Sequence, residues 1–155
     1  MMINESSKRI IPFQPRDAKS MGEGCFYMDL ILWLNGTNIE MGDGVRFNYG
    51  CYVNGFGGLT IGDRTGFGPF TLVHTANHVT DYDSEGAWYD KGWENRPVKI
   101  GSDCWIGMGA SILPGVTIGD RVVIGAGSVV VHDIPDDSLA AGNPARVIRR
   151  RGELK

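Results

Sequence analysis

The sequence has 155 residues, of which 42% are apolar and 21% charged, enough to build one folded domain and to exclude global disorder. Its 23 glycines follow no Gly-X-Y period, which excludes collagen and indicates many tight turns between short strands. The formal charge is −3; residues 146–155 hold five basic side chains and one acidic one, so residues 1–145 carry 10 basic and 17 acidic groups. The net negative charge of residues 1–145 argues against a nucleic-acid partner.

Residues 1–35 show the weakest pattern, and we expect them to form an N-terminal cap. The first 20 residues mix basic and polar side chains and contain no apolar signal core. The longest apolar run, near Phe26 to Leu34, contains Asp29 and falls well short of the ~20 residues needed to cross a bilayer. The sequence therefore predicts no transmembrane segment.

A six-residue apolar period begins at residue 39. Two short runs show it, Ile39, Val45, Cys51 and then Ile61, Phe67, Val73, with a slip of four residues between them. Beyond residue 98 it runs unbroken through Ile100, Ile106, Ile112, Ile118, Ile124 and Val130. Six residues of a helix advance about 600°, which scatters these positions over three sides, whereas a strand returns to one face after any even step. The period therefore predicts extended structure.

Short strands that turn every six residues build a solenoid with a continuous apolar interior. We predict an all-β fold of this kind. If each coil has three sides, Ile100 stacks on Ile118, Ile106 on Ile124, and Ile112 on Val130.

Residues 74–97 interrupt the period as a long loop excursion. Residues 81–96 hold five acidic and two basic side chains, and Trp88, Tyr89 and Trp93 argue against a purely solvated linker. We expect this loop to fold against a surface such as a neighbouring subunit. Residues 98–133 form the most regular coils, and residues 134–155 form a C-terminal tail that caps the open coil, within a single domain spanning 1–155.

The segment WIGMGASILPGVTIGDRVVIGAGSVVVHDIP, followed by AAGNPARVIR, closely resembles the hexapeptide-repeat acyltransferases. Within them it is most similar to the maltose, galactoside and polysaccharide O-acetyltransferase branch. The resemblance covers about residues 39–149 and is most specific over 98–149. It implies a left-handed parallel β-helix, acetyl-CoA as co-substrate, a saccharide or other small-molecule acceptor, no metal, and a homotrimer with active sites between subunits.

Histidine supplies the candidate base. A loop histidine such as His78 is, from the residues alone, more often a polar surface group than a catalyst. The resemblance reverses this, because His78 matches the family's active-site histidine, which takes a proton from the acceptor in direct transfer without an acyl-enzyme. Asn77, in the same Asn-His step, is then an acceptor contact. His74 matches no catalytic position.

Further site residues also follow from the resemblance. Asn48 is either an acceptor contact or a turn residue. Trp105 lies between two inward positions and should point outward, where it matches the tryptophan beside the pantetheine of CoA and borders the acceptor. The remaining expected CoA contacts are Met108, Gly109, Ala126, Gly127, His132, Arg146 and Arg149. His132 stands where the family commonly has a Thr-Lys pair, which leaves a weaker phosphate contact. Phe56 replaces an acidic acceptor contact of the galactoside enzymes, so their sugar specificity is not carried over.

Cys25, Cys51 and Cys104 show no Cys-x-x-Cys spacing and indicate reduced intracellular thiols in a cytoplasmic protein. Cys51 and Cys104 occupy inward positions, which disfavours a catalytic thiol.

Several functions fit the residues. The first is an acetyl-CoA-dependent O-acetyltransferase that acts on a sugar hydroxyl in cell-surface polysaccharide synthesis. The alternatives within the class are an N-acetyltransferase of an amino sugar or nucleotide-linked amino sugar and an enzyme that acetylates a xenobiotic. A zinc protein similar to γ-type carbonic anhydrases needs three histidines that converge on one metal ion. Residues 98–130 contain no histidine, which disfavours this alternative. A non-catalytic structural solenoid would bind no CoA.

Overall fold

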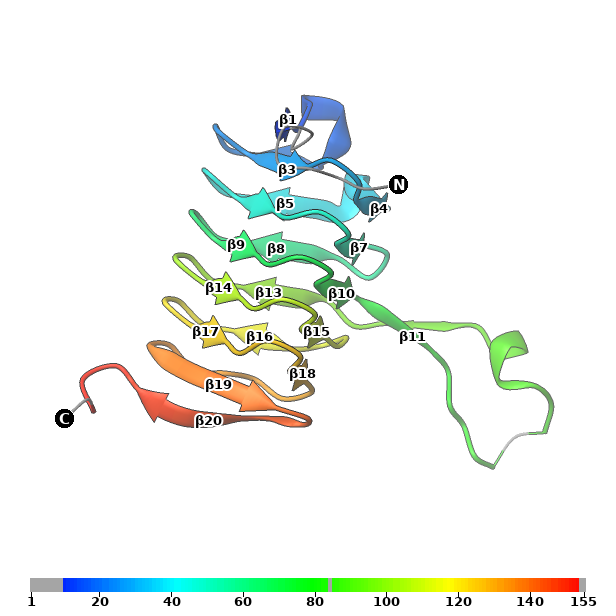
Figure 1. The fold of residues 1–155 in the computed structure, drawn as a ribbon. Helices are drawn as coiled ribbons and strands as arrows, with labels where there is room; N and C mark the ends of the chain where they lie inside the picture. Colours follow the sequence, from blue (N-terminus) through cyan, green and yellow to red (C-terminus); the bar gives the residue numbers. More distant parts are fainter. Residues whose placement is uncertain (1–9, 84, 154–155) are drawn as a thin grey trace, which may run out of the picture.

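The computed structural model describes residues 10–83 and 85–153, and this part of the chain consists almost entirely of short strands (Figure 1). Strands of two or three residues alternate with tight turns in which glycine or a polar residue interrupts the apolar period. Single turns of 3-10 helix lie at η2 (Pro15–Asp17), η3 (Gly36–Asn38) and η4 (Trp88–Asp90). Within the described residues, no helix has the length and apolarity required to span a bilayer.

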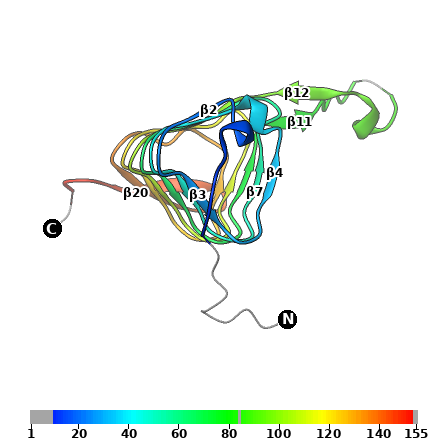
Figure 2. The same ribbon diagram turned by 90° about the horizontal axis from the view of Figure 1, so that it is seen from above.

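Three sheets form the sides of a triangular prism (Figure 2). Sheet 1 contains β2 (Ser20–Met21), β5 (Ile39–Met41), β8 (Leu59–Ile61), β13 (Val98–Ile100) and β16 (Thr117–Ile118). Sheet 2 contains β1 (Ile10–Pro12), β3 (Phe26–Met28), β6 (Arg46–Phe47), β9 (Gly66–Phe67), β14 (Trp105–Ile106), β17 (Val123–Ile124), β19 (Ser138–Gly142) and β20 (Ala145–Arg150). Sheet 3 contains β4 (Leu32–Leu34), β7 (Tyr52–Asn54), β10 (Leu72–His74), β15 (Ser111–Ile112) and β18 (Val129–Val130). The chain visits the sheets in this order once per coil and forms the expected left-handed parallel β-helix.

The register confirms the predicted stacking of the later coils. Ile100 pairs with Ile118, Ile106 with Ile124, and Ile112 with Val130, all in parallel. These side chains are fully buried and form the apolar column inside the prism. Burial of a large aliphatic side chain contributes about 1.5–3 kcal/mol, so the repeated column is the main source of stability.

The predicted phase of the earlier coils was wrong. Met41 pairs with Ile61 and Phe47 with Phe67, so the equivalents of Ile61 and Phe67 are not Ile39 and Val45. Ile39 and Val45 are also buried, because residues two apart on a strand face the same side. Instead of a slip of four residues, the turn at 55–58 is two residues longer than the equivalent turn at 114–115, and the early coils span 20 residues instead of 18.

Residues 20–34 form a complete coil, so the N-terminal cap is shorter than the expected span 1–35. Met21, Tyr27 and Trp33 pair with Met41, Phe47 and Val53, which extends the six-residue period to the first coil. Methionine and two aromatic residues stand at these positions instead of isoleucine and hide the repeat. Within the described residues, 10–18 cover the open end, where the Phe13 ring lies 4.9 Å from Tyr27 and 4.7 Å from Trp33.

The interruption of the solenoid is an antiparallel hairpin, which we call the arm (residues 75–97). It contains β11 (Ala76–His78) and β12 (Trp93–Asn95) and leaves the corner between sheets 3 and 1 (Figures 1 and 2). Both views show it extending away from the prism. Its predicted contact with a neighbouring subunit stays a prediction.

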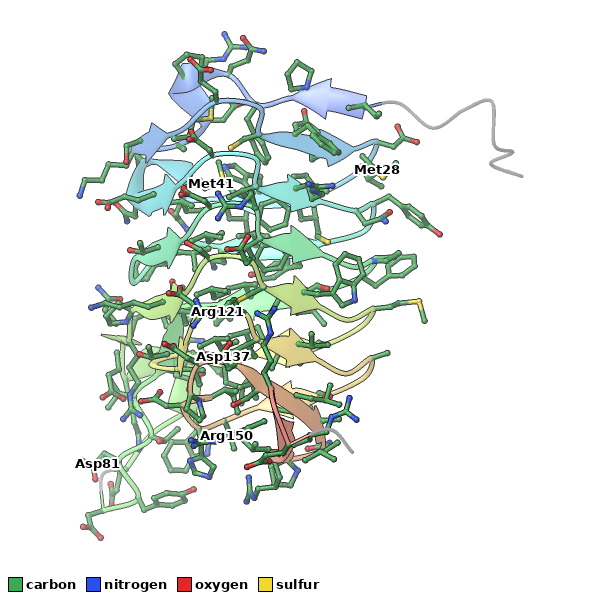
Figure 3. The ribbon with its side chains drawn as sticks, turned by 90° about the vertical axis from the view of Figure 1, so that its left-hand side faces the viewer. Met28, Met41, Asp81, Arg121, Asp137 and Arg150 are labelled. Atoms are coloured by element: carbon green, nitrogen blue, oxygen red, sulfur yellow. The ribbon has the colours of Figure 1, made fainter. Side chains whose placement is uncertain are left out.

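The C-terminal hairpin of β19 and β20 closes the other end, in the place expected for the capping tail. Its turn contains the cis Asn143–Pro144 peptide. At the corner between sheets 1 and 2, charged residues of successive coils pair in a column: Arg121 donates two bonds to Asp137, at 2.7 and 2.9 Å, and Arg64 does the same to Asp103 (Figure 3). These pairs are solvent-exposed, so we assign them a modest share of the stability.

Candidate functional site

His78 lies at the root of the arm, opposite Trp93. Hydrogen-bonded pairs alternate along this hairpin: the Val79 N–H donates to Gly92 O at 3.1 Å, and the Arg96 N–H donates to Thr75 O at 2.9 Å. His78 and Trp93 therefore form a non-hydrogen-bonded pair, in which side chains approach most closely. Their ring centroids lie 3.9 Å apart with the planes inclined by 33°. Trp93 was not predicted as a site residue; only the hairpin register brings it to the histidine.

The two ring nitrogens of His78 have different surroundings. Nδ1 is buried and has no hydrogen-bond partner among the described residues. Nε2 is not a buried atom that lacks a partner. Nε2 is therefore the nitrogen that remains available to an acceptor.

The root of the arm is fixed to the solenoid through Thr75, which is fully buried. Its hydroxyl accepts the Gly57 N–H at 2.7 Å and donates to Asn54 O at 2.9 Å. On the other strand of the arm, Arg96 O accepts the Gly115 N–H at 3.1 Å. The arm is thus bonded to the turn of the coil above and to that of the coil below, which sets the position of His78.

Asn77 does not share a face with His78. Neighbouring residues on a strand point to opposite sides, so the exposed Asn77 side chain pairs with Glu94 on the other face of the arm. Its predicted acceptor contact stays a prediction, and the geometry of one chain does not support it.

Trp105 points outward from sheet 2 and is 48% exposed. It packs beside Gly66, where an added Cβ would lie 3.1 Å from the indole ring. Asn48 and Trp105 line one groove of about 260 Å³ on this face. The Asn48 side-chain oxygen accepts the Tyr49 N–H at 2.9 Å, so it also serves the turn. The structure thereby joins two residues that the sequence assigned separately.

Four of the predicted CoA contacts lie in stacked turns between sheets 2 and 3. The Gly127 N–H donates to Met108 O at 2.8 Å, which places the turn containing Ala126 directly against that containing Gly109. Gly109 and Gly127 both have φ of +66°, and a Cβ on either would meet no atom within 4 Å. These turns present an open edge of small side chains beside the exposed Met108.

His132 lies elsewhere. It follows β18, at the corner between sheets 3 and 1, so a single chain does not bring it to the edge formed by Met108 and Ala126. Its expected phosphate contact stays a prediction that needs a second chain.

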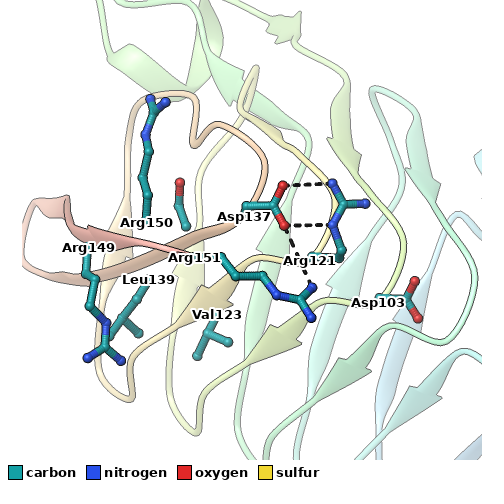
Figure 4. A pocket seen from close by; sticks show the side chains of 9 residues that line it. Asp103, Arg121, Val123, Asp137, Leu139, Arg149, Arg150 and Arg151 are labelled. Carbon is teal, nitrogen blue, oxygen red and sulfur yellow. Dashed lines mark hydrogen bonds and ion pairs between the residues drawn. The ribbon is translucent and has the colours of Figure 1, made fainter. Parts of the chain in front are cut away.

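The tail arginines lie on β20. Arg146 stands opposite Ala141 and Arg149 opposite Leu139. Arg149 also lines a cavity of about 460 Å³ whose floor is Val123 and Leu139 and whose walls carry Asp103, Arg121, Asp137, Arg150 and Arg151 (Figure 4). This end of the solenoid is therefore suited to phosphate groups.

The three thiols and His74 are not part of either group of site residues. Cys25, Cys51 and Cys104 are free and buried, and burial raises the pKa of the Cys51 thiol to about 11, which keeps it protonated and unreactive. Burial also lowers the pKa of His74, which lies beside Tyr52 and stays neutral near pH 7. Residues 10–83 and 85–153 contain no group of three side chains placed to hold a metal ion.

The candidate site residues form two clusters, which lie far apart within one chain. His78 and Trp93 belong to the arm at the corner between sheets 3 and 1, whereas Trp105 and Asn48 lie on or beside sheet 2, the opposite side of the prism (Figure 2). A reaction that uses both clusters therefore requires two chains.

Comparison with known proteins identifies relatives of this chain. Residues 97–132 match the family described as bacterial transferase hexapeptide (six repeats). A maltose O-acetyltransferase from Clostridium difficile 630 is 38% identical, with a TM-score of 0.71 over 86% of this chain and 67% of that one. A hexapeptide-repeat-containing acetyltransferase from Vibrio cholerae, solved with acetyl coenzyme A, is 34% identical, with a TM-score of 0.76 over 88% and 73%.

Among curated proteins, a Schizosaccharomyces pombe protein provisionally named an acetyltransferase is 41% identical over 115 residues. That alignment covers 74% of this chain and 54% of the relative. The chain thus spans about half the length of the curated relatives it matches.

Proposed function

Because the chain belongs to the hexapeptide-repeat acyltransferase family, we propose that it transfers the acetyl group of acetyl-CoA to a sugar hydroxyl. The proposed setting is cell-surface polysaccharide synthesis in the cytoplasm. The observation that carries the proposal is the likeness to a maltose O-acetyltransferase over 86% of the chain, which includes the coils on both sides of the arm.

His78 is the proposed general base. Its Nε2 takes the proton of the acceptor hydroxyl while the hydroxyl oxygen attacks the thioester carbonyl carbon of acetyl-CoA. The carbon–sulfur bond then breaks, the CoA thiolate leaves, and the imidazolium returns the proton to sulfur. Trp93 covers one side of the imidazole, and the Thr75 anchor holds the strand, so the base is oriented before the acceptor arrives.

Acetyl-CoA is proposed to lie along the edge formed by Trp105, Met108, Gly109, Ala126 and Gly127, with its phosphates toward Arg146, Arg149 and His132. The support is the open glycine edge, which permits close approach of a pantetheine chain, and the exposed arginines of β20. Asn48, in the same groove as Trp105, is the proposed acceptor contact on this side, together with Asn77 from the arm.

Calorimetric titration with acetyl-CoA tests this assignment. We expect about one site per chain, and Arg146→Ala should weaken binding by about 10- to 100-fold, because a charge-assisted hydrogen bond contributes about 1.5–3 kcal/mol. Arg16→Ala, an exposed arginine at the other end of the solenoid, is the matched control and should bind as the parent does. Absence of binding at millimolar acetyl-CoA contradicts the proposed function.

The separation of the two clusters supports a homotrimer in which His78 of one chain meets Trp105 of the next. Light scattering should give three chains, and a monomer contradicts the arrangement. Co-expression of His78→Ala with Trp105→Ala should restore about a quarter of the parent activity, since random cyclic assembly leaves that share of sites with both native residues. Without restoration, the two residues do not act across an interface.

A further inference from the structure

A groove lies on the outer face of sheet 1, next to the root of the arm. Its volume is about 390 Å³, within the usual range for small-molecule sites. Phe56 and Pro97 border it on the side of the arm, and its floor crosses β5, β8 and β13 through the outward residues Glu40, Thr60 and Lys99. No residue of this groove belongs to the clusters assigned above.

Half-exposed aromatic rings connect this groove with His78. The Phe56 ring, which is 42% exposed, lies 5.9 Å from the Trp93 ring. Trp93 is 52% exposed and contacts His78 at 3.9 Å. Trp93 therefore touches the proposed base and also the residue that borders the groove, and the three rings form a continuous path along the root of the arm.

The lining of the groove combines donors and acceptors at short range. Glu40 accepts from Lys19 Nζ at 2.6 Å, and the Asn38 amide donates to Phe56 O at 3.2 Å. The side chains of Thr60 and Lys99 make no hydrogen bond to another described residue, although both are exposed in the groove. They are thus available to a ligand, while Glu40 retains acceptor capacity.

An aromatic border beside mixed hydrogen-bonding groups fits the chemistry of a sugar chain. Each sugar ring carries hydroxyls that donate and accept, and also a face of C–H groups with slight positive charge that stacks on the negative face of an aromatic ring. Two cationic side chains and one carboxylate give the groove a weakly positive balance within an acidic chain, so it accepts neutral or anionic glycans.

We propose that this groove binds the sugar units adjacent to the one that is acetylated, so that the acceptor is an oligosaccharide or polysaccharide instead of a free monosaccharide. The inference rests on the proposed function, because His78 defines where the acetylated unit lies. Trp93 and Phe56 stack the units that lead from His78, and Glu40, Thr60 and Lys99 bind the hydroxyls of the next ones.

The test uses α-glucan, β-glucosamine and β-galactan ladders of one to six units with the full-length protein. Acetyl transfer is measured by mass spectrometry and binding by saturation-transfer NMR. In at least one ladder, we expect KM to fall on the order of tenfold between one and four units. Thr60→Trp should fill the groove and raise KM for the four-unit sugar to the value for the single unit.

Thr117→Trp is the matched control, because Thr117 occupies the same outward column of sheet 1 two coils further along and lies outside the groove. It should leave the length dependence intact. Equal KM at all lengths in all ladders, or equal effects of both variants, overturns the proposal. If CoA binds but no sugar is acetylated, the proposed function fails. In that case, NMR binding that grows with sugar length and is abolished by Thr60→Trp still supports the sugar-binding groove. Absence of such binding rejects the groove proposal.

Discussion

Replacement of His78 by alanine should lower kcat for acetyl transfer by about 10²- to 10⁴-fold, the usual contribution of a positioned general base. The side chain has its Nδ1 buried and its ring against Trp93, so the variant removes the one imidazole at the root of the arm. Affinity for acetyl-CoA should stay within about twofold of the parent, because the proposed CoA edge lies on other elements. Steady-state kinetics with calorimetric titration separates the two quantities.

His74→Gln provides the matched control. His74 lies four residues earlier on β10, where it faces Tyr52, and it serves no proposed step. Its variant should retain most of the activity. If His78→Ala keeps more than about a tenth of the parent kcat, another group acts as the base.

Replacement of Gly57 by alanine should destabilise the protein at the root of the arm. An added Cβ would collide with Thr75 O and lie 3.0 Å from Arg96 N. Those two atoms form the hydrogen bond that closes the root of the arm, so the methyl group must separate the strands or displace the turn. Overpacking of this kind costs about 1–3 kcal/mol, and urea unfolding should show it.

The same variant should also lower kcat, because the displaced root carries His78, while CoA affinity stays at the parent value. Hydrogen exchange of residues 76–78 should accelerate as the root loosens. Gly86→Ala is the control: its Cβ would meet no atom within 4 Å, and its strain at φ +100° is confined to the exposed tip. An unfolding midpoint for Gly57→Ala equal to that of Gly86→Ala would falsify the anchoring role.

The later coils show how far periodicity reaches. The six-residue spacing of Ile100, Ile106 and Ile112 predicted the pairs with Ile118, Ile124 and Val130, and the register agrees at each of them. The prediction succeeded because the turns of these coils all have one length. Equivalent positions in successive coils are then always the same number of residues apart.

The first coils show where periodicity fails. Ile39 and Met41 are both buried on β5, so burial alone does not tell which one stacks on Ile61. The turn length decides, and two additional residues at 55–58 shift the register without altering the apolar pattern. Likewise, Tyr27 and Trp33 occupy coil positions although neither matches the isoleucine pattern, and both rings pack against Phe13 of the cap.

By itself the sequence determined the solenoid, its coil length after residue 98, the outward position of Trp105 and the place of His78 at the start of the arm, because these depend on spacing along the chain. Only the tertiary structure decided that the arm is a hairpin, that Trp93 lies on His78, that Asn48 joins Trp105, and that a groove adjoins Phe56. Those contacts join residues 15 to 57 positions apart, and they are set by strand register and turn length, which a local apolar pattern does not encode.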